Sequence, residues 1–345
     1  MKESSLKLTC QMKKIDERGD FIIEVVIEAS VEEEKLIFGP FDEYAKLIEQ
    51  NLKLSLIARN GQIKLMGEEP DVLKAQKIVQ QLLVFARKDK EIHKQQIHYL
   101  LSLAMENQEE KLKEISEDIL CKTVSGKPVK PKTIGQKNYV DTIRQKMIVF
   151  GLGPAGTGKT YLAMAMAIQA FKNHEVNRII LTRPAIEAGE KLGFLPGDLQ
   201  SKVDPYLRPL YDALHQIMGV ESFVHNSEKG LIEVAPLAYM RGRTLDQAYI
   251  ILDEAQNTTP AQMKMFLTRI GFGSKVIITG DLSQKDLSPN AVSGLEVALN
   301  VLKKVTDIGF VFLDSQDVVR HPLVQKIVLA YESYEKREEK KAKKR

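Results

Sequence analysis

Apolar residues in the first quarter of the chain follow short alternating and helical patterns. These patterns predict, in chain order, a strand at 21–29, a helix at 41–50, two hairpin strands at 53–58 and 62–66, and a helix at 70–86. Asn60-Gly61 is a strong signal for the hairpin turn, and Pro70 suits the first turn of a helix. The last helix should bury Leu73, Ile78, Leu82 and Phe85. Residues 1–88 are therefore predicted to form a small α+β domain.

The next stretch, residues 89–132, reads as a helical linker. A charged helix should carry an apolar stripe made of Ile97, Leu100, Leu101, Ala104 and Met105. After Cys121, the chain combines Gly126, Pro128 and Pro131 with lysines, a composition typical of loops. The stretch thus joins two folded parts.

From residue 133 to residue 330, apolar strands alternate with helices, which predicts an α/β fold with a parallel sheet covered on both faces. The candidate strands are 147–152, 178–182, 248–252, 275–279 and 309–313. Residues 184–230 are too long for a plain connection, so we interpret them as an insertion that contacts a partner or substrate. Residues 331–345 are a charged tail that we expect to be disordered; a solubilising role and attraction to RNA both remain open.

Composition limits the class of protein to which this chain can belong. A chain of 345 residues with 43% apolar and 28% charged residues is long enough for two globular domains. No apolar segment reaches the length of a membrane span, and the amino terminus lacks the apolar core of a secretion signal. We therefore expect a cytoplasmic protein with no membrane partner. The net charge of +4 is too small to indicate nucleic acid by itself, and the two cysteines do not suggest a disulfide framework.

The strongest chemical signal follows the strand at 147–152. It is a match to the phosphate-loop pattern G-x-x-x-x-G-K-[ST], formed by Gly153, Pro154, Ala155, Gly156, Thr157, Gly158, Lys159 and Thr160. Glycines let backbone N–H groups approach a polyphosphate, and the amino end of the following helix attracts the same anion. Lys159 can neutralise the β and γ phosphates, and the Thr160 hydroxyl can bind Mg²⁺. A glycine-rich turn that matches the pattern by chance is the alternative, and the flanking strand and helix disfavour it.

A pair of acids ends the strand at 248–252. Asp253 is predicted to hold Mg²⁺ together with Thr160, and Glu254 is predicted to take a proton from the attacking water. The alternative is a pair of acids that stabilises a helix amino terminus. The apolar strand in front of the pair favours the catalytic interpretation.

A third signal, Thr279-Gly280-Asp281-Leu282-Ser283-Gln284, follows the strand at 275–279. Gln284 can form a hydrogen bond to the γ-phosphate or to the lytic water. The pattern is weak alone, and its position after an acid pair makes it more specific.

Taken together, these motifs resemble those of a known class of ATPases. Residues 133–136, 153–160, 253–256 and 280–284 are similar, in order, to the glutamine motif and motifs I, II and III of superfamily 1 helicases. With Leu181-Thr182-Arg183-Pro184, and with residues 193–197 and 318–322, the chain resembles the PhoH-like proteins over residues 20–330. The fold that this resemblance implies is a RecA-like P-loop NTPase core.

The same resemblance implies an activity and site residues. It implies a cytoplasmic ATPase that uses ATP and Mg²⁺, forms a homo-oligomeric ring and works in RNA metabolism. Gln136 would read adenine, Gln284 would sense the γ-phosphate, and Arg320 would supply a cation to the transition state. Three other arginines compete for the last role, namely Arg183, Arg243 and Arg269.

The amino-terminal domain resembles a KH RNA-binding domain in its order of elements. Gly39-Pro40-Phe41-Asp42 stands where KH domains have a GXXG loop that clamps the nucleic-acid backbone. Asp42 replaces the second glycine and would bring negative charge toward a phosphate. An RNA-binding role and a structural or oligomerising role are therefore both open.

Length also argues for assembly. Superfamily 1 helicases place ATP between two RecA-like cores of one chain, whereas the residues after the linker suffice for one core. A neighbouring subunit would then close the site and supply charge to the leaving phosphate. We therefore predict a ring, with a hexamer as the expected size.

Three hypotheses of function follow. The leading one is an Mg²⁺-dependent ATPase that couples hydrolysis to work on RNA or on an RNA-processing protein partner. The alternative is a regulatory ATP-binding module that controls assembly with a protein partner. A small-molecule kinase is disfavoured because Glu254 and Gln284 are suited to activating water.

Overall fold

A computed structural model describes residues 8–15, 21–89, 92, 94–105, 118–184, 199–288 and 291–319, with a few single residues between 323 and 334. The chain divides into two compact units, and the divisions fall near residues 112 and 320.

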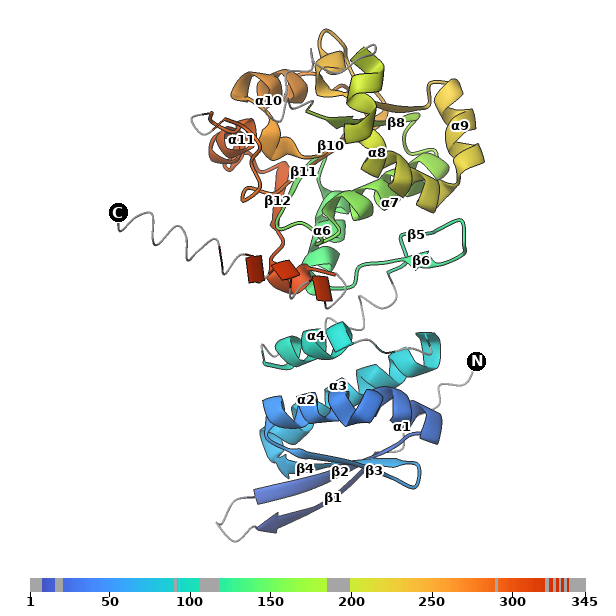
Figure 1. Ribbon diagram of the computed structural model, residues 1–345, viewed down its shortest axis with the longest axis vertical. Coiled ribbons are helices and arrows are strands. Elements are labelled where there is room, and N and C mark those ends of the chain that lie inside the picture. The colour runs from blue at the N-terminus through green and yellow to red at the C-terminus, as the bar shows by residue number, and fades with distance from the viewer. Residues whose placement is uncertain are drawn as a thin grey trace, which may run out of the picture. The chain divides into compact units, whose positions relative to one another are not determined.

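The first unit is an antiparallel sheet with helices on one face (Figure 1). Its elements are β1 (Leu8–Ile15), β2 (Phe21–Glu28), α1 (Val31–Phe38), η1 (Pro40–Asp42), α2 (Glu43–Leu52), β3 (Ser55–Arg59), β4 (Gln62–Glu68), α3 (Glu69–Asp89) and α4 (Lys94–Met105). The strand order is β1-β2-β4-β3. In β2 the side chains alternate between buried and partly exposed positions, so one face of the sheet packs against the helices. The predicted small α+β region is confirmed.

Two elements of this unit go beyond the sequence prediction. β1 pairs with β2, and a register shift between Gln11 and Lys14 interrupts the alternation that would have revealed it. α1 begins at a capping box, in which the Ser30 side chain accepts from the Glu33 backbone and the Glu33 side chain accepts from the Ser30 backbone. Serine followed three residues later by glutamate is a helix signal that the apolar pattern alone does not contain.

Two residues of the predicted apolar stripes are exposed. Leu73 in α3 is 45% exposed, whereas its neighbour Val72 is fully buried. Ile78 and Leu82 are buried as predicted, so Leu73 lies at the margin of a buried face made of Val72, Ala75, Ile78, Val79, Leu82, Leu83 and Ala86. Met105, the last described residue of α4, is also exposed, at 56%.

The second unit contains a six-stranded sheet in which every pairing is parallel. Its elements are β5 (Cys121–Lys122), β6 (Pro128–Val129), α6 (Ile134–Gln145), β7 (Ile148–Leu152), α7 (Lys159–Lys172), β8 (Arg178–Arg183), α8 (Leu199–Met218), α9 (Val220–Glu228), β9 (Ile232–Pro236), η3 (Leu237–Met240), β10 (Ala248–Leu252), η4 (Ala255–Asn257), α10 (Pro260–Leu267), β11 (Lys275–Gly280), α11 (Gly294–Leu302), β12 (Ile308–Phe312) and η5 (Ser315–Asp317). β5 and β6 form a separate two-stranded ladder.

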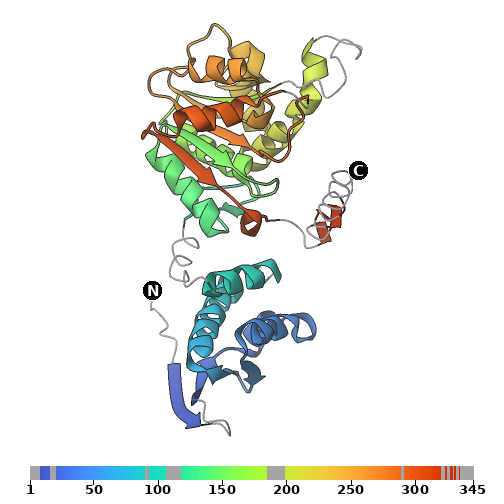
Figure 2. The ribbon, with the colours of Figure 1, turned by 90° about the vertical axis from the view of Figure 1, so that its left-hand side faces the viewer.

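Both faces of the six-stranded sheet are covered. Tyr249 and Ile251 of β10 pack in the core beneath α6, α7, α8 and α9, whereas Ile250 and Leu252 pack beneath α10 and α11. Figure 1 shows these two helical layers on opposite sides of the sheet, and Figure 2 shows the unit from the side. Burial on both sides explains why the strands read as continuous apolar runs. The predicted class, an α/β parallel sheet of the P-loop type, is confirmed.

The stretch predicted as an insertion at 184–230 contains part of the fold itself. α8 and α9 bury Leu207, Leu210, Leu214 and Phe223 in the same core as α7. They then lead into β9, an edge strand beside β8 that the apolar pattern did not reveal. Residues 185–198, which include the Gly193–Gly197 motif, lie outside the described residues, as does the charged tail from residue 335 onward.

Among the described helices, none combines the length and apolar character needed to cross a membrane.

Candidate functional site

The sequence motifs meet at the carboxyl edge of the parallel sheet. The strand order β12-β7-β11-β10-β8-β9 places β11 between the strand that precedes the phosphate loop and the strand that precedes the acid pair. In such sheets the loops at the carboxyl ends of the strands form the crevice where ligands bind. The residues after β7, β8, β10 and β11 are therefore brought to one place.

The phosphate loop contacts the backbone of the neighbouring strand ends β11 and β12. Gly153 donates its N–H to the Gly280 carbonyl at 3.1 Å. A side chain at Gly153 would place a Cβ 2.3 Å from the Leu313 carbonyl oxygen, so only glycine fits there. Gly158, the residue before α7, has a left-handed conformation with φ 77°. The loop is thereby fixed in a shape that few other sequences can adopt.

Lys159 is the first residue of α7, and its amine folds back over the loop. Its Nζ donates to the carbonyl oxygens of Gly153, at 2.5 Å, and Pro154, at 2.8 Å. The Thr157 hydroxyl lies 3.3 Å from the same nitrogen. The side chain is largely buried, so little water screens its positive charge, which would attract a phosphate bound at the loop.

At the carboxyl edge of the sheet, Asp253 follows β10 and contacts residues of the two neighbouring strands, β8 and β11. Its Oδ1 accepts hydrogen bonds from the Thr160 hydroxyl and the Thr279 hydroxyl, both at 2.6 Å. The residue is only 3% exposed. A buried carboxylate needs such donors because its charge is costly to desolvate. The two residues predicted to hold magnesium, Thr160 and Asp253, therefore lie in direct contact across 93 positions of sequence.

Arg183, at the carboxyl end of β8, occupies the other oxygen of Asp253. Its Nε donates to Oδ2 at 2.8 Å, and its Nη2 forms an ion pair with the same oxygen at 2.6 Å. Nη2 also lies 3.7 Å from Glu254 Oε1, and Nη1 donates to the Tyr206 carbonyl of α8 at 2.8 Å. Of the three candidate arginines that the structure describes, this one is in the site.

Glu254 follows Asp253 in a left-handed backbone conformation, with φ 55°. That conformation is unfavourable for a residue with a Cβ, and it turns the two neighbouring carboxylates in different directions. The Glu254 side chain is 43% exposed and lines the pocket. Its Oε2 accepts from the Gln256 side chain at 2.6 Å.

Gln256 joins the acid pair to the third motif, a role that sequence reasoning missed. Its Nε2 donates to Glu254 Oε2 and, at 3.0 Å, to the Gln284 carbonyl. Its Oε1 accepts the Asp281 N–H, also at 3.0 Å. A buried amide two residues after an acid pair is the signal that could have indicated this function.

Asp281 and Gln284 face the phosphate loop from β11. Asp281 Oδ2 accepts the N–H of Ala155 at 3.1 Å, and its Oδ1 accepts the Ser283 N–H and hydroxyl. The side chain of Gln284 is exposed and lines the pocket. The structure therefore brings Gln284 to the same cavity as Glu254, while Asp281, which received no role from the sequence, holds the loop.

Gln136 lies buried beneath the phosphate loop. Its Nε2 donates to the Thr157 carbonyl at 3.1 Å, and its Oε1 accepts the Lys132 N–H at 2.7 Å. Both ends of the amide are therefore engaged with backbone groups. In this arrangement Gln136 supports the loop, and its predicted contact with adenine would require an exchange of partners.

The chain after β12 returns to the phosphate loop. The Val319 N–H donates to the Gly156 carbonyl at 3.0 Å, and Asp317 accepts from the Thr133 hydroxyl at 2.5 Å. Burial raises the pKa of Asp317 above its ordinary value. Arg320, the predicted transition-state cation, lies outside the described residues.

Two other candidate arginines lie at the opposite edge of the sheet. Arg243 forms a bidentate ion pair with Glu233, at 2.6 and 2.7 Å, and precedes β10. Arg269 precedes β11 and donates to the Arg243 carbonyl at 3.5 Å. Because both stand before the amino ends of their strands, the structure separates them from the pocket of the same chain.

The residues at the carboxyl edge enclose a pocket of about 270 Å³. Its lining residues are Ala155, Gly156, Gly158, Lys159, Thr160, Tyr161, Asp253, Glu254, Gly280, Asp281 and Gln284. The loop backbone and Lys159 suit a polyphosphate. A hydroxyl beside a carboxylate suits Mg²⁺, which takes one or two protein oxygens and completes its shell with water and phosphate. Elsewhere in the described residues, no cluster of three or more His, Cys, Asp or Glu is arranged for a metal.

Comparison with known proteins agrees with this geometry. The sequence model described as PhoH-like protein matches residues 128–332. A PhoH-like protein of Bacillus subtilis is 53% identical over 86% of this chain and 93% of its own length. This chain belongs to the PhoH-like protein family. Protein PhoH of Escherichia coli K12 is 39% identical over 77% of the chain and 74% of its own length.

The similarity to solved structures is weaker than the sequence similarity to PhoH-like proteins. The Sulfolobus solfataricus SWI2/SNF2 ATPase core in complex with dsDNA aligns with 17% identity and a TM-score of 0.30, over 42% of this chain and 31% of that chain. A likeness of this size carries no argument about function. The family match, by contrast, includes every site residue described above.

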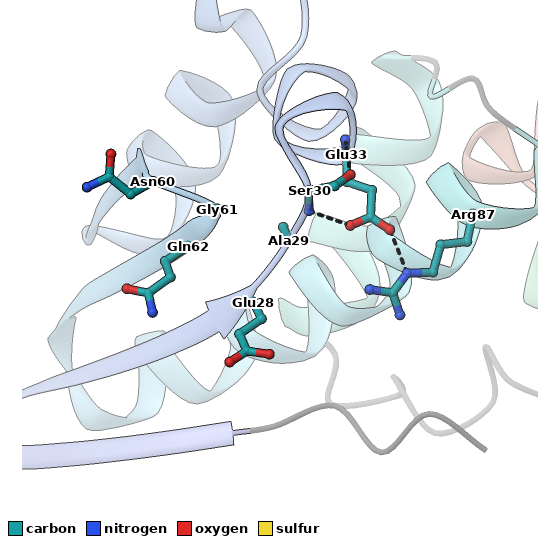
Figure 3. A pocket seen from close by; sticks show the side chains of 8 residues that line it. All are labelled: Glu28, Ala29, Ser30, Glu33, Asn60, Gly61, Gln62 and Arg87. Atoms are coloured by element: carbon teal, nitrogen blue, oxygen red, sulfur yellow. Dashed lines mark hydrogen bonds and ion pairs between the residues drawn. The ribbon is translucent and has the colours of Figure 1, made fainter. Parts of the chain in front are cut away.

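A second pocket of this PhoH-like chain, of about 370 Å³, lies in the α+β unit (Figure 3). Figure 3 shows Glu33 between Ser30 and Arg87. The Arg87 Nε donates to Glu33 Oε1 at 2.6 Å, and this hydrogen bond holds the pKa of Glu33 below its ordinary value. The charged groups of Glu33 and Arg87 are thus engaged in joining α1 to α3, and this pocket presents no comparable chemistry.

Proposed function

We propose that the chain binds ATP with Mg²⁺ in the pocket at the carboxyl edge of the sheet and hydrolyses it. The observation that carries this proposal is the 2.6 Å contact between the Thr160 hydroxyl and Asp253. It unites the phosphate loop with the acid pair, and the same pocket is lined by Glu254 and Gln284. A nucleotide switch or a kinase would not need a glutamate in that place.

Each side chain has a distinct task in this mechanism. The backbone of residues 153–158 and Lys159 bind the phosphates, and Lys159 turns from the loop carbonyls to the β and γ oxygens. Glu254 accepts a proton from the attacking water, and Gln284 orients that water or the γ-phosphate. Gln256 holds the Glu254 carboxylate in place.

Thr160 and Asp253 would hold the magnesium ion. When bound, the ion supplies positive charge that stabilises the β and γ phosphate oxygens. Thr160 would contribute its hydroxyl oxygen, and Asp253, which accepts a hydrogen bond from that hydroxyl, would orient it.

Two substitutions test this assignment. Glu254→Gln should leave binding of Mg²⁺ and ATP intact and slow phosphate release by about 10²-fold, the usual scale for a positioned base. Lys159→Ala should weaken nucleotide binding itself, measured by titration calorimetry. Glu296→Gln, which removes a carboxylate from α11 outside the pocket, serves as the control and should behave as the parent protein. Normal turnover in Glu254→Gln would show that the base is misassigned.

We further propose that hydrolysis is coupled to RNA in the cytoplasm. The exposed Phe41 supports this proposal, because it is 95% exposed in the loop between α1 and α2 and an aromatic ring can stack on a base. RNA should then raise ATP turnover, and Phe41→Ala should reduce the stimulation without changing basal turnover. Turnover that responds to a protein partner and ignores RNA would favour the regulatory module instead.

A further inference from the structure

Arg183 contacts two residues that belong to different parts of the fold, Asp253 after β10 and Tyr206 in α8. Its Nε donates to Asp253 Oδ2, its Nη2 forms an ion pair with the same oxygen, and its Nη1 donates to the Tyr206 carbonyl of α8. Its side chain is 17% exposed, so this charged group is held in a mostly dry place. The arrangement joins the acid pair to a helix that contributes no residue to the pocket lining.

The carboxylate of Asp253 is fully used in this arrangement. Oδ1 accepts hydrogen bonds from Thr160 and Thr279, and Oδ2 accepts one from Arg183 Nε and pairs with Nη2 at 2.6 Å. A carboxylate offers about four acceptor positions. A magnesium ion, or a water bound to it, can therefore engage Asp253 only when a donor leaves. Arg183 is the donor expected to leave Asp253, because its guanidinium is positively charged and repels the magnesium ion, whereas the two hydroxyls are neutral.

We propose that Arg183 is a positioning residue that competes with magnesium for Asp253 and, on leaving it, loosens the start of α8. This inference rests on the proposed function, because it takes Thr160 and Asp253 as the magnesium site. Glu254 Oε1, 3.7 Å from Nη2, is the nearest acceptor to which the guanidinium can turn. That turn draws Nη1 away from Tyr206.

The first turns of α8 have few hydrogen bonds to hold them once Arg183 leaves the Tyr206 carbonyl. Pro205 and Pro209 each lack a backbone N–H, so this part of the helix has fewer internal hydrogen bonds than an ordinary helix. Loss of the Arg183 donor at Tyr206 removes one more restraint. Linkage makes the effect reciprocal: whatever holds α8 in place should also strengthen the Arg183 pair and weaken magnesium binding.

The first measurement is the affinity for ADP with Mg²⁺ and with EDTA, in the parent protein, in Arg183→Gln and in Arg183→Lys. The dissociation constant with EDTA divided by the dissociation constant with Mg²⁺ reports how much magnesium strengthens ADP binding. Arg183→Gln removes the competing charge and should raise that ratio about tenfold, within the usual range of coupling. Arg183→Lys keeps a cation beside Asp253 and should leave the ratio near that of the parent. Arg87→Gln, which breaks the ion pair between Arg87 and Glu33 in the α+β unit, is the matched control and should leave the ratio unchanged.

The second measurement is amide hydrogen exchange in peptides that cover residues 199–210. In the parent protein and in Arg87→Gln, exchange should rise with ADP and Mg²⁺ and stay unchanged with ADP and EDTA. In both Arg183 variants, exchange should be fast whether or not magnesium is present, since neither side chain can bond Asp253 and Tyr206 together.

An unchanged or lower ratio in Arg183→Gln, or α8 exchange that ignores magnesium in the parent protein, would overturn the inference while leaving ATP binding intact. Failure of the parent protein to bind ADP with Mg²⁺ at all would overturn the proposed function as well. The two failures are thus distinguished by the parent protein alone.

Discussion

At the scale of single residues, the site depends on a few buried polar groups that connect motifs. Asp253, Gln256 and Asp281 each accept or donate hydrogen bonds across loops that are far apart in sequence. Such groups are expensive to bury unless every partner is in place. This cost explains why the site geometry should be rigid and why single changes should propagate to neighbouring motifs.

Gln256→Ala tests this view of the network. The change leaves the Asp281 N–H and the Gln284 carbonyl without their partner, which should cost roughly 1–3 kcal/mol of stability. It also frees the Glu254 carboxylate, so kcat should fall at least about tenfold while ADP affinity stays the same. Thermal unfolding and steady-state turnover measure the two effects.

Gln262→Ala is the control for that experiment. Gln262 completes the capping box of α10 with Thr259 and does not line the pocket. Its removal should cost about 1 kcal/mol or less and leave kcat unchanged. Equal losses of turnover in the two variants would contradict a specific role for Gln256.

At the scale of elements, α6 is joined to the segment that precedes β5 by a cluster of charges. Asp118 accepts from Arg144 at 2.6 and 2.7 Å and lies 3.1 Å from Lys137. The Arg144 guanidinium, followed by Lys137, holds the pKa of Asp118 below its ordinary value. Since α6 also carries Gln136 beneath the phosphate loop, this cluster helps to fix the foundation of the site.

Asp118→Asn should lower the free energy of unfolding by about 1–2 kcal/mol at pH 7. Because the folded-state pKa of Asp118 is depressed, its contribution is complete above the unfolded pKa of about 4 and is lost as pH falls through the folded value. The stability difference between parent and variant should therefore be constant from pH 5 to pH 8 and shrink below about pH 4. Urea unfolding at a series of pH values measures it.

Asp141→Asn provides the comparison within the same cluster. Asp141 is more exposed than Asp118, and its pairs with Lys137 and Arg144 lie along one helix surface. Such surface pairs contribute about 0.3–0.5 kcal/mol. A loss in Asp141→Asn as large as that in Asp118→Asn would contradict the special position of Asp118.

The element scale also shows where apolar patterns succeed. The predicted strands at 147–152, 178–182, 248–252, 275–279 and 309–313 correspond to β7, β8, β10, β11 and β12 within a residue or so at each end. These strands are buried on both faces or adjoin such strands, so their sequences are apolar without interruption. β9 and β1 gave no clear signal because polar residues interrupt their apolar positions, whereas β12 and β3, which also lie at sheet edges, have mostly apolar sequences and were predicted.

At the scale of the whole molecule, the described residues contain one P-loop core, whereas two-core ATPases cover the nucleotide with a second core of the same chain. We expect neighbouring copies to supply that cover, with Arg320 as the residue proposed to reach the leaving phosphate. Sedimentation should show a closed oligomer, with a hexamer as the expected size, and ATP turnover per chain should rise with protein concentration until assembly is complete. A stable monomer with full turnover would remove this prediction.

The sequence by itself determined the class of the fold and the residues of the phosphate loop, the acid pair and Gln284, because glycine spacing, a lysine and acids at strand ends carry their chemistry locally. Only the tertiary structure decided which polar groups meet. It placed Arg183 on Asp253, Gln136 under the loop and Gln256 between two motifs, and it put Arg243 and Arg269 at the far edge. Sequence patterns record which way a residue faces, whereas strand order and register decide which distant residue it faces.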